Sequence, residues 1–305
     1  MFENLIEVLK NDPRKIVYTE GHDARILESA ARLKKEGFLT PILVGNVDVV
    51  KEAAAKGGFD IDGLEILDPL TYEGMDAMVE EMVALRKGKM SAEDCRAALS
   101  KGNYFGTMLV KTKKGANLVS SCFIMIRDDE MLAMGDCAIN IDYQDKLDKE
   151  GNVVLSAAAQ LAEVAVATAH TAEVFGIDPK VAMLSYSTKG SGKGPAVDLV
   201  REATAIAKEM APELKLDGEM QFDAAVSPVV GQLKFPGSPV AGYANTFIFP
   251  EIQSGNIGYK IAARLGGFMA VGPILQGLNA PINDLSRGCN AEEVYQMSII
   301  TAALK

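Results

Sequence analysis

The sequence predicts an α/β protein in which mostly parallel sheets are covered by helices on both faces. Short apolar runs alternate with longer amphipathic stretches, and the apolar runs end in turns rich in glycine, aspartate and asparagine. The chain has 305 residues, of which 48% are apolar and 24% are charged. That length suits one large domain or two ordinary ones, and the composition excludes a disordered or fibrous chain.

The first third of the chain alternates strand and helix. Lys15–Tyr18 is a short β-rich run, and Ala24–Glu36 has the apolar spacing of a helix that Gly37 closes. The alternation continues with strands at Thr40–Val44 and Leu64–Leu67 and helices at Val47–Lys56, Thr71–Arg86 and Ser91–Leu99.

The remaining two thirds follow the same pattern. Strands are predicted at Phe123–Ile126, Met131–Ile139, Val181–Leu184, Phe222–Val226 and Thr246–Phe249, and Gly272–Leu275 leads into a loop at Asn279–Gly288. Helices are predicted at Ala157–Phe175, Pro195–Ala211, Ser254–Leu265 and Ala291–Leu304. In such folds ligands bind beyond the carboxyl ends of the strands, so the turns that follow strands are the places to look for a site.

Composition narrows the class of function. The chain has 31 Lys and Arg against 41 Asp and Glu, a formal charge of −10, so it is a poor generic nucleic-acid binder. A small anionic substrate stays possible if the electrostatic potential is positive within a local pocket. We find no signal peptide and no run of about 18 apolar residues, which predicts a soluble cytoplasmic protein without a membrane span.

The residues that most often carry catalysis or metal are scarce. The chain has only two histidines, His22 and His170, and no H-E-x-x-H motif, which argues against a Ser-His-Asp triad or a catalytic zinc. None of the four cysteines forms a C-x-x-C pair, so neither a zinc site nor a disulfide framework is expected. Chemistry therefore depends on carboxylates, arginines, hydroxyls and backbone donors.

The loop Ser185–Gly194 is the first candidate site. It joins a predicted strand to a predicted helix and holds hydroxyls, two lysines and three glycines, which suits an anion at a helix N-terminus. Ser187, Thr188 and Lys189 are its candidate substrate-binding residues. The loop matches neither the P-loop nor G-x-G-x-x-G, so a flexible solvated loop is an equal alternative.

Two further candidates carry arginines. Ser286 and Arg287 precede the last predicted helix, where a guanidinium fork would match phosphate and a serine could donate to an oxyanion. Glu293 falls in the first turn of that helix, and Arg86 at the end of another. A purely structural role would also explain both residues, because acids at helix N-termini and cations at helix C-termini interact favourably with the helix dipole.

Together these segments resemble the phosphate acetyltransferase family, within the phosphate acetyl/butyryltransferases. The likeness runs nearly end to end and in order. The matching motifs are Tyr18–Arg25, Tyr104–Val110, Gly135–Asp142, Val181–Ser191, Asp217–Ala225, Ser238–Asn245, Gly255–Lys260, Gly272–Asn279 and Asn283–Gly288.

The resemblance implies a fold of two α/β domains with the active site in the cleft between them, like that of isocitrate and isopropylmalate dehydrogenases. The first domain would hold Met1–Ser121 and Val271–Lys305, and the second Cys122–Ala270. It also implies a homodimer in acetate metabolism that interconverts acetyl-CoA plus phosphate with acetyl phosphate plus coenzyme A. Coenzyme A would be a substrate, and no cofactor or metal is implied.

The resemblance assigns roles to the candidates. Glu293 would be the base that deprotonates the coenzyme A thiol, at a position where many relatives carry Asp. Ser286 would stabilise the oxyanion on the acetyl carbonyl, and Arg287 would hold the phosphoryl oxygens. Arg86 would be a second substrate-binding arginine. Further substrate-binding candidates in the matching motifs are Asn256, Tyr259 and Asn283.

One departure from the family pattern follows Val110. Relatives carry there a block with another active-site arginine, whereas here Lys111 and Thr112 join straight on. Either the chain is a natural or engineered deletion, or a mobile segment is missing from this sequence, with a physical gap between about Val110 and Gly115. A true deletion predicts weak or no transferase activity, unless another cation such as Lys189 takes over the arginine's role.

Two alternatives stay open. A phosphate butyryltransferase or another short-acyl transferase would differ only in pocket shape. A non-catalytic regulatory module that binds acyl-CoA is favoured by the missing block and opposed by the presence of Ser286, Arg287 and Glu293. An NAD-dependent dehydrogenase is disfavoured because the Rossmann fingerprint is absent.

Overall fold

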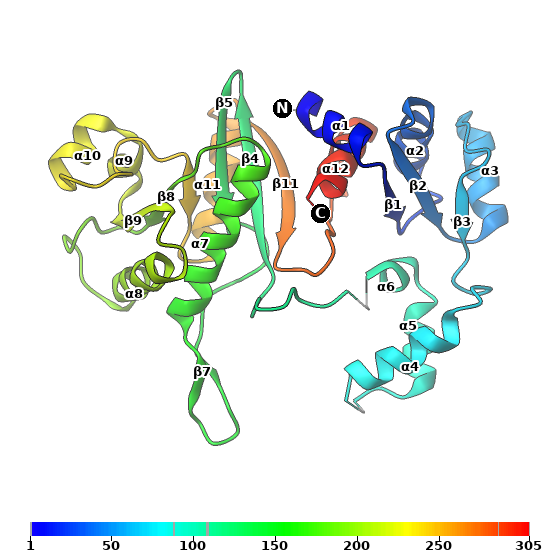
Figure 1. Cartoon of the computed structure of the whole chain (residues 1–305), viewed down its shortest axis with the longest axis horizontal. Helices are drawn as coiled ribbons and strands as arrows, with labels where there is room; N and C mark the ends of the chain where they lie inside the picture. Colours follow the sequence, from blue (N-terminus) through cyan, green and yellow to red (C-terminus); the bar gives the residue numbers. More distant parts are fainter. Residues whose placement is uncertain (1, 88, 108–109, 286, 305) are drawn as a thin grey trace. The chain divides into compact units, whose positions relative to one another are not determined.

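The computed structural model describes residues 2–87, 89–107, 110–285 and 287–304. The described chain divides into two compact units (Figure 1). Unit 1 comprises residues 1–111 and 279–305, and unit 2 comprises residues 112–278. Both units combine helices with strands, and the strands pair mostly in parallel, as the sequence predicts.

The unit boundaries differ from the domain boundaries expected from the sequence. We expected the first domain to end at Ser121 and to resume at Val271. Strand β11 (Met269–Gln276) pairs antiparallel with β4 (Ser120–Arg127), so it belongs to the sheet of unit 2. The residues just before β4 follow it, since Lys113 N donates to Gly277 O over 2.8 Å.

Unit 1 is built on three parallel strands in the order β1 (Arg14–Tyr18), β2 (Leu39–Val44) and β3 (Glu65–Leu67). Its helices are α1 (Phe2–Asn11), α2 (Ala24–Glu36), α3 (Val47–Gly57), α4 (Met75–Leu85), α5 (Ala92–Leu99), α6 (Gly102–Thr107) and α12 (Ala291–Ala303). Helix α12 packs against α1, α2 and β1, so the last helix of the chain lies beside its first strand (Figure 1).

Unit 2 holds a six-stranded sheet in the order β11, β4, β5 (Glu130–Gly135), β10 (Thr246–Ile248), β8 (Lys180–Leu184) and β9 (Lys215–Met220). The three pairs from β5 to β9 are parallel. The other elements are the hairpin strands β6 (Lys146–Leu147) and β7 (Val153–Leu155), and helices α7 (Ala157–Val174), α8 (Pro195–Met210), α9 (Phe222–Val226), α10 (Pro228–Lys234) and α11 (Ile252–Arg264).

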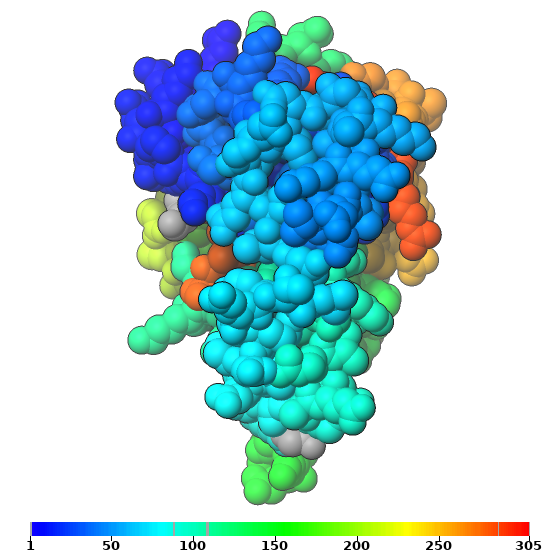
Figure 2. Space-filling view, turned by 90° about the vertical axis from the view of Figure 1, so that its right-hand side faces the viewer, coloured from blue at the N-terminus to red at the C-terminus, as the bar shows by residue number. Residues whose placement is uncertain are grey.

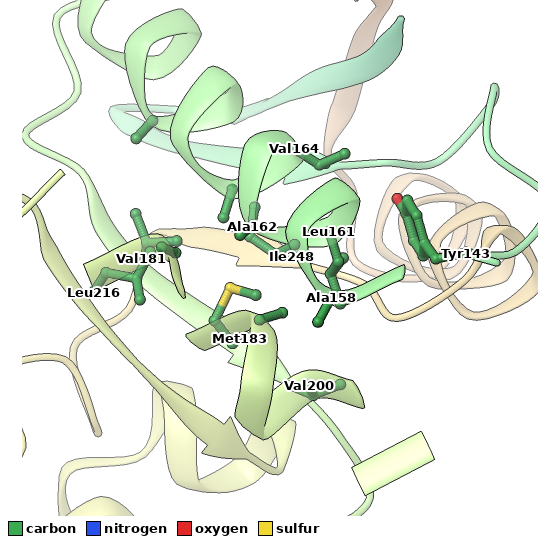
Figure 3. Close-up of a cluster of buried hydrophobic side chains, with 14 of the residues drawn as sticks. Tyr143, Ala158, Leu161, Ala162, Val164, Val181, Met183, Val200, Leu216 and Ile248 are labelled. Carbon is green, nitrogen blue, oxygen red and sulfur yellow. The ribbon is translucent and has the colours of Figure 1, made fainter. Parts of the chain in front are cut away.

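The two faces of this sheet are buried by different helices. On β8, Val181 and Met183 pack with residues of α7 and α8, such as Leu161 and Val200 (Figure 3). Ala182 and Leu184 point to the opposite face and join a second cluster that includes Phe247. Strand residues alternate between faces, so a run that is apolar at every position is what a strand covered on both sides requires.

One predicted element is wrong. Phe222–Val226 was expected to be a strand, but it forms helix α9, and the strand β9 lies just before it. The β9 sequence hides its strand because two of its buried residues, Asp217 and Glu219, are acids. The apolar pattern therefore pointed to the next segment along the chain.

The described helices include none that is long and apolar enough to cross a membrane.

Candidate active site

The Ser-Arg-Gly segment lies in unit 1, directly before α12. Ser286 lies outside the described residues, so its role as an oxyanion donor stays a prediction. Arg287 is exposed, and among the described residues no hydrogen bond or ion pair holds its guanidinium. An anionic ligand would therefore not have to displace an internal partner from that guanidinium.

A neighbouring arginine fixes the backbone of this segment. Arg25 Nη1 donates to the carbonyl oxygens of Arg287 over 2.8 Å and of Cys289 over 3.0 Å. Its remaining donors pair with Asp23, whose carboxylate also caps α2. Arg25 thus ties the turn after β1 to the segment that carries Arg287. Sequence reasoning missed this role, although Arg25 lies within one of the matching motifs.

Glu293 occupies the N3 position of a capping box at the start of α12. Its backbone N–H donates to Asn290 Oδ1, and its Oε2 accepts from the Asn290 N–H, both over 2.9 Å. The stabilising cap foreseen from the sequence is therefore present. Within the described part of the chain, the other carboxylate oxygen, Oε1, accepts no hydrogen bond, so it keeps free lone pairs at an exposed site.

The other unit 1 candidates lie on helix ends and connecting segments. Arg86 is exposed at the C-terminal end of α4, where its backbone N–H donates to Met82 O over 2.9 Å. The face of unit 1 formed by α4 to α6 (cyan) is visible in Figure 2. Asn283 Nδ2 donates to Thr301 Oγ1 over 2.8 Å, which fastens the segment before Arg287 to α12.

The loop Ser185–Gly194 of unit 2 is not a loose solvated loop. Three nested interactions close it. The Tyr186 hydroxyl donates to Lys193 O over 2.8 Å, and the Gly192 N–H donates to Ser187 Oγ over 2.9 Å. Innermost, the Thr188 N–H donates to Ser191 Oγ over 2.9 Å.

The tip of this loop, Lys189–Gly190, is held by Glu219 of β9. Gly190 N–H donates to Glu219 Oε1 over 2.7 Å, and Lys189 N–H donates to Glu219 O over 3.1 Å. Ser187 Oγ also donates to Oε1 over 2.8 Å. An internal carboxylate thus already uses donors that the sequence assigned to an external anion, and Ser187 is fully buried. Sequence reasoning missed Glu219.

Glu219 stays ionised inside the protein. Burial raises its pKa, but hydrogen bonds from Gly190 N–H and Ser187 and the nearby Arg201 outweigh burial, so the net pKa lies below its usual value. Thr188 is likewise buried, and its Oγ1 accepts from Gln221 N–H over 2.9 Å. Of the three loop candidates, only Lys189 is exposed.

A second loop of unit 2 is organised in the same way. Buried Asp136, after β5, accepts from Ser121 Oγ and from the N–H groups of Ala138 over 3.1 Å and Asn140 over 2.9 Å. Asn256 on α11 reaches this loop, since its Nδ2 donates to Cys137 O over 3.1 Å.

Helix α11 approaches that loop closely. Gly255 leaves no room for a Cβ, which would meet Asp136 O. Tyr259, one turn on from Gly255, stacks on Phe123 with ring centroids 4.0 Å apart. Burial raises the pKa of Tyr259. The structure therefore places Asn256 and Tyr259 in internal contacts that pack α11 onto the sheet.

The candidate residues are divided between the two units. Arg86, Asn283, Arg287 and Glu293 lie in unit 1, whereas Ser187, Thr188, Lys189, Asn256 and Tyr259 lie in unit 2. In the described parts of the chain, no group of three or more His, Cys, Asp or Glu side chains could hold a metal ion.

Comparison with known proteins assigns the chain to a family. Two segments of the chain, residues 1–114 and 109–302, match the family model described as phosphate acetyl/butaryl transferase. The chain belongs to this family.

Relatives in the family are similar over almost the whole chain. A phosphate acetyltransferase of Bacillus subtilis is 47% identical over 332 aligned residues, which cover 99% of this chain and 98% of the relative. The crystal structure of a phosphotransacetylase from Streptococcus pyogenes matches with a TM-score of 0.92 at 48% identity, covering 99% of this chain and 97% of that one. A branched-chain phosphotransacylase from Enterococcus faecalis, at 18% identity and a TM-score of 0.61 over 95% of this chain and 99% of that one, shares the fold.

The family match is interrupted where the sequence departs from the family pattern. The two matched segments overlap at residues 109–114. The alignment with the Bacillus subtilis relative spans 332 positions, more than the 305 residues of this chain. The Bacillus subtilis relative therefore carries residues that this chain lacks. Here Asn279 N–H donates to Lys111 O over 2.8 Å, and Thr112 forms a bridge with Leu278.

Proposed function

We propose that this chain is an acyltransferase that interconverts acetyl-CoA plus phosphate with acetyl phosphate plus coenzyme A. The observation that carries the proposal is the 47% identity to a relative named phosphate acetyltransferase over nearly the full length of both chains. Arg287 supports it, because it is exposed and its guanidinium has no internal partner among the described residues. Coenzyme A is a substrate in this proposal, and no cofactor is needed.

In the proposed mechanism both substrates are bound when the acetyl group moves. Glu293 Oε1 takes the proton of the coenzyme A thiol, whose ordinary pKa near 8.5 leaves little thiolate at neutral pH. The thiolate sulfur forms a bond to the acetyl carbonyl carbon, and the bond from that carbon to the phosphate oxygen breaks. Phosphate leaves with the electron pair. No acyl-enzyme is formed, which agrees with the scarcity of histidine in the sequence.

The positive groups have separate tasks in this mechanism. Arg287 holds the phosphoryl oxygens, and Ser286 donates to the oxyanion that develops on the carbonyl. Arg86 binds substrate as a second arginine. Arg287, Arg86 and Glu293, which carry most of these tasks, all lie in unit 1.

The decisive experiment measures formation of acetyl-CoA from acetyl phosphate and coenzyme A. We expect turnover by the wild type and a loss of about 10²- to 10³-fold in Arg287→Ala, the range for removing a donor to developing charge. Arg96→Ala is the matched control, because Arg96 is another exposed arginine of unit 1, and its only described ionic partner is exposed Asp76. If Arg287→Ala turns over as fast as the control, the site assignment is wrong.

Acyl preference is settled by the same assay. We expect a lower kcat/KM with butyryl phosphate than with acetyl phosphate. Each methylene group that fits the pocket poorly should lower kcat/KM by about 10- to 200-fold. A higher kcat/KM with butyryl phosphate would make the chain a short-acyl transferase instead.

A regulatory module that binds acyl-CoA is the second candidate, and the interrupted family match favours it. This candidate predicts acetyl-CoA binding by calorimetry without turnover. Inserting the corresponding segment of the Bacillus subtilis relative between Lys111 and Thr112 should then restore activity. Wild-type turnover without the insertion would exclude this candidate.

The proposal also includes a homodimer in the cytoplasm that serves acetate metabolism. Light scattering of the purified chain tests the dimer directly, since a monomeric mass at assay concentration would contradict it.

A further inference from the structure

The tip of the loop Ser185–Gly194 has an unfavourable backbone conformation that contacts from outside the loop hold in place. Lys189 adopts φ +48°, a left-handed conformation that costs a residue with a Cβ on the order of 1 kcal/mol. Such backbone persists only where surrounding contacts enforce it. The backbone N–H groups of both tip residues donate to one residue, Glu219 of β9.

Glu219 is built as a support and not as a reacting group. Its side chain is only 3% exposed. Oε1 accepts from Ser187 Oγ and Gly190 N–H, and Oε2 lies 3.4 Å from Arg201 Nε. Both oxygens are therefore engaged inside the protein, so the carboxylate cannot take a proton from a substrate without breaking the loop.

The charge of Lys189 remains available. The carboxylate beneath the tip is Glu219, and Arg201 on α8 pairs with it. The Lys189 ammonium lies 4.9 Å from the Phe235 ring centroid, and within the described residues no carboxylate pairs with it. The loop also leads into the N-terminal end of α8, a helix of 16 residues whose dipole adds to the positive field. In a chain of net charge −10, this tip is locally positive.

We propose that Glu219 is a positioning residue for the phosphate-bearing substrates: by holding the Lys189–Gly190 turn, its carboxylate presents the Lys189 ammonium to a substrate phosphate. The phosphate belongs to either acetyl phosphate or coenzyme A. This inference rests on the proposed function, because it concerns the binding step of that same reaction.

The first test measures loop order without activity. Hydrogen exchange of residues 185–194 should be at least about tenfold faster in Glu219→Gln, because the neutral amide weakens the bonds to Gly190 N–H and Ser187. Asp217→Asn is the matched control. Asp217 is buried on the same strand, accepts from Lys208 Nζ over 2.7 Å, and has no contact with the loop tip among the described hydrogen bonds. Unchanged exchange in Glu219→Gln overturns the proposal.

The second test measures binding. Glu219→Gln should raise KM for one of the two substrates about tenfold and change kcat less than about twofold. The substrate whose KM rises is the one whose phosphate meets Lys189. Lys189→Ala should raise the same KM, and the double variant should be no worse than Lys189→Ala alone, because Glu219 acts through Lys189. Additive effects of the two substitutions would mean that Glu219 is merely structural and would overturn the proposal.

Failure of the proposed function gives a different result. If the wild type shows no turnover, the transferase reading fails, and the affinities for coenzyme A and acetyl phosphate by calorimetry replace KM in the same comparison. Glu219→Gln should then weaken one affinity about tenfold relative to Asp217→Asn. Equal affinities in Glu219→Gln, Asp217→Asn and the wild type overturn the positioning role independently of catalysis.

Discussion

In unit 2 the loop Ser185–Gly194 closes round the carboxylate of Glu219, whereas in unit 1 the segment before α12 leaves the Arg287 guanidinium without a partner among the described residues. Both regions looked like anion sites in the sequence. The first uses most of its donors to hold its own shape and offers one side chain, Lys189. The second is held from outside by Arg25, so its own side chain stays free. Donor-rich sequence alone does not tell these cases apart.

The largest effect should come from separating the two functions of Glu293. Glu293→Gln keeps the capping box, because Gln can also accept from the Asn290 N–H, but it cannot act as a base. We expect kcat to fall by about 10²- to 10⁴-fold with an unchanged melting temperature. Glu292→Gln is the control, because Glu292 lies in the same turn and pairs with Arg32. Normal kcat in Glu293→Gln would leave the carboxylate with its capping role only.

Ser187→Ala asks whether the unit 2 loop is structural. The Ser187 hydroxyl is buried, donates to Glu219 and accepts from the Gly192 N–H. Its removal leaves both groups short of a partner and should lower the free energy of unfolding by about 1–3 kcal/mol in urea denaturation. Unchanged stability together with weaker substrate binding would instead favour the direct substrate contact predicted from the sequence.

Asn290→Ala probes the unit 1 segment with a smaller effect. Asn290 Oδ1 accepts from the Glu293 N–H at the start of α12. Loss of that cap should reduce the free energy of unfolding by about 1 kcal/mol. Its effect on kcat should be well below that of Glu293→Gln. An equal loss of kcat in both variants would mean that the orientation of α12, and not the Glu293 carboxylate, limits the reaction.

The smallest expected effect is the pH dependence of folding stability that Glu219 of unit 2 contributes. The pKa of Glu219 is lower in the folded chain than in the unfolded one, so its ionised form stabilises the fold above the unfolded pKa. That contribution is lost as pH falls through the folded pKa. The stability difference between wild type and Glu219→Gln should therefore be largest near pH 7 and shrink below about pH 4.5, the ordinary range for Glu. A difference that grows in acid would contradict this assignment.

The sequence predicted most elements within a few residues, because apolar periodicity is strong in strands covered on both faces. It failed at Phe222–Val226 because β9 buries Asp217 and Glu219, and an acid inside a strand looks like a turn. The same two acids explain why Glu219 was missed as the support of the loop.

The candidate site was predictable only in part. The family motifs pointed to Arg287, Glu293 and Lys189, which the structure finds exposed. Burial of Ser187 and Thr188 depends on the strand that follows α8, and spacing within the loop says nothing about that strand. Motifs identify residue types near a site, whereas the partner of each donor is fixed by tertiary pairing.

Strand β9 forms one margin of the six-stranded sheet, and such margins invite pairing with a strand of another molecule. Its acids at positions 217 and 219 are bound to Lys208 and Arg201 of α8. A strand of another molecule that paired with β9 would meet a sheet edge that carries charged residues and is joined to α8 by ion pairs. We therefore expect the two acids that hide β9 in the sequence to oppose extension of the sheet by another strand.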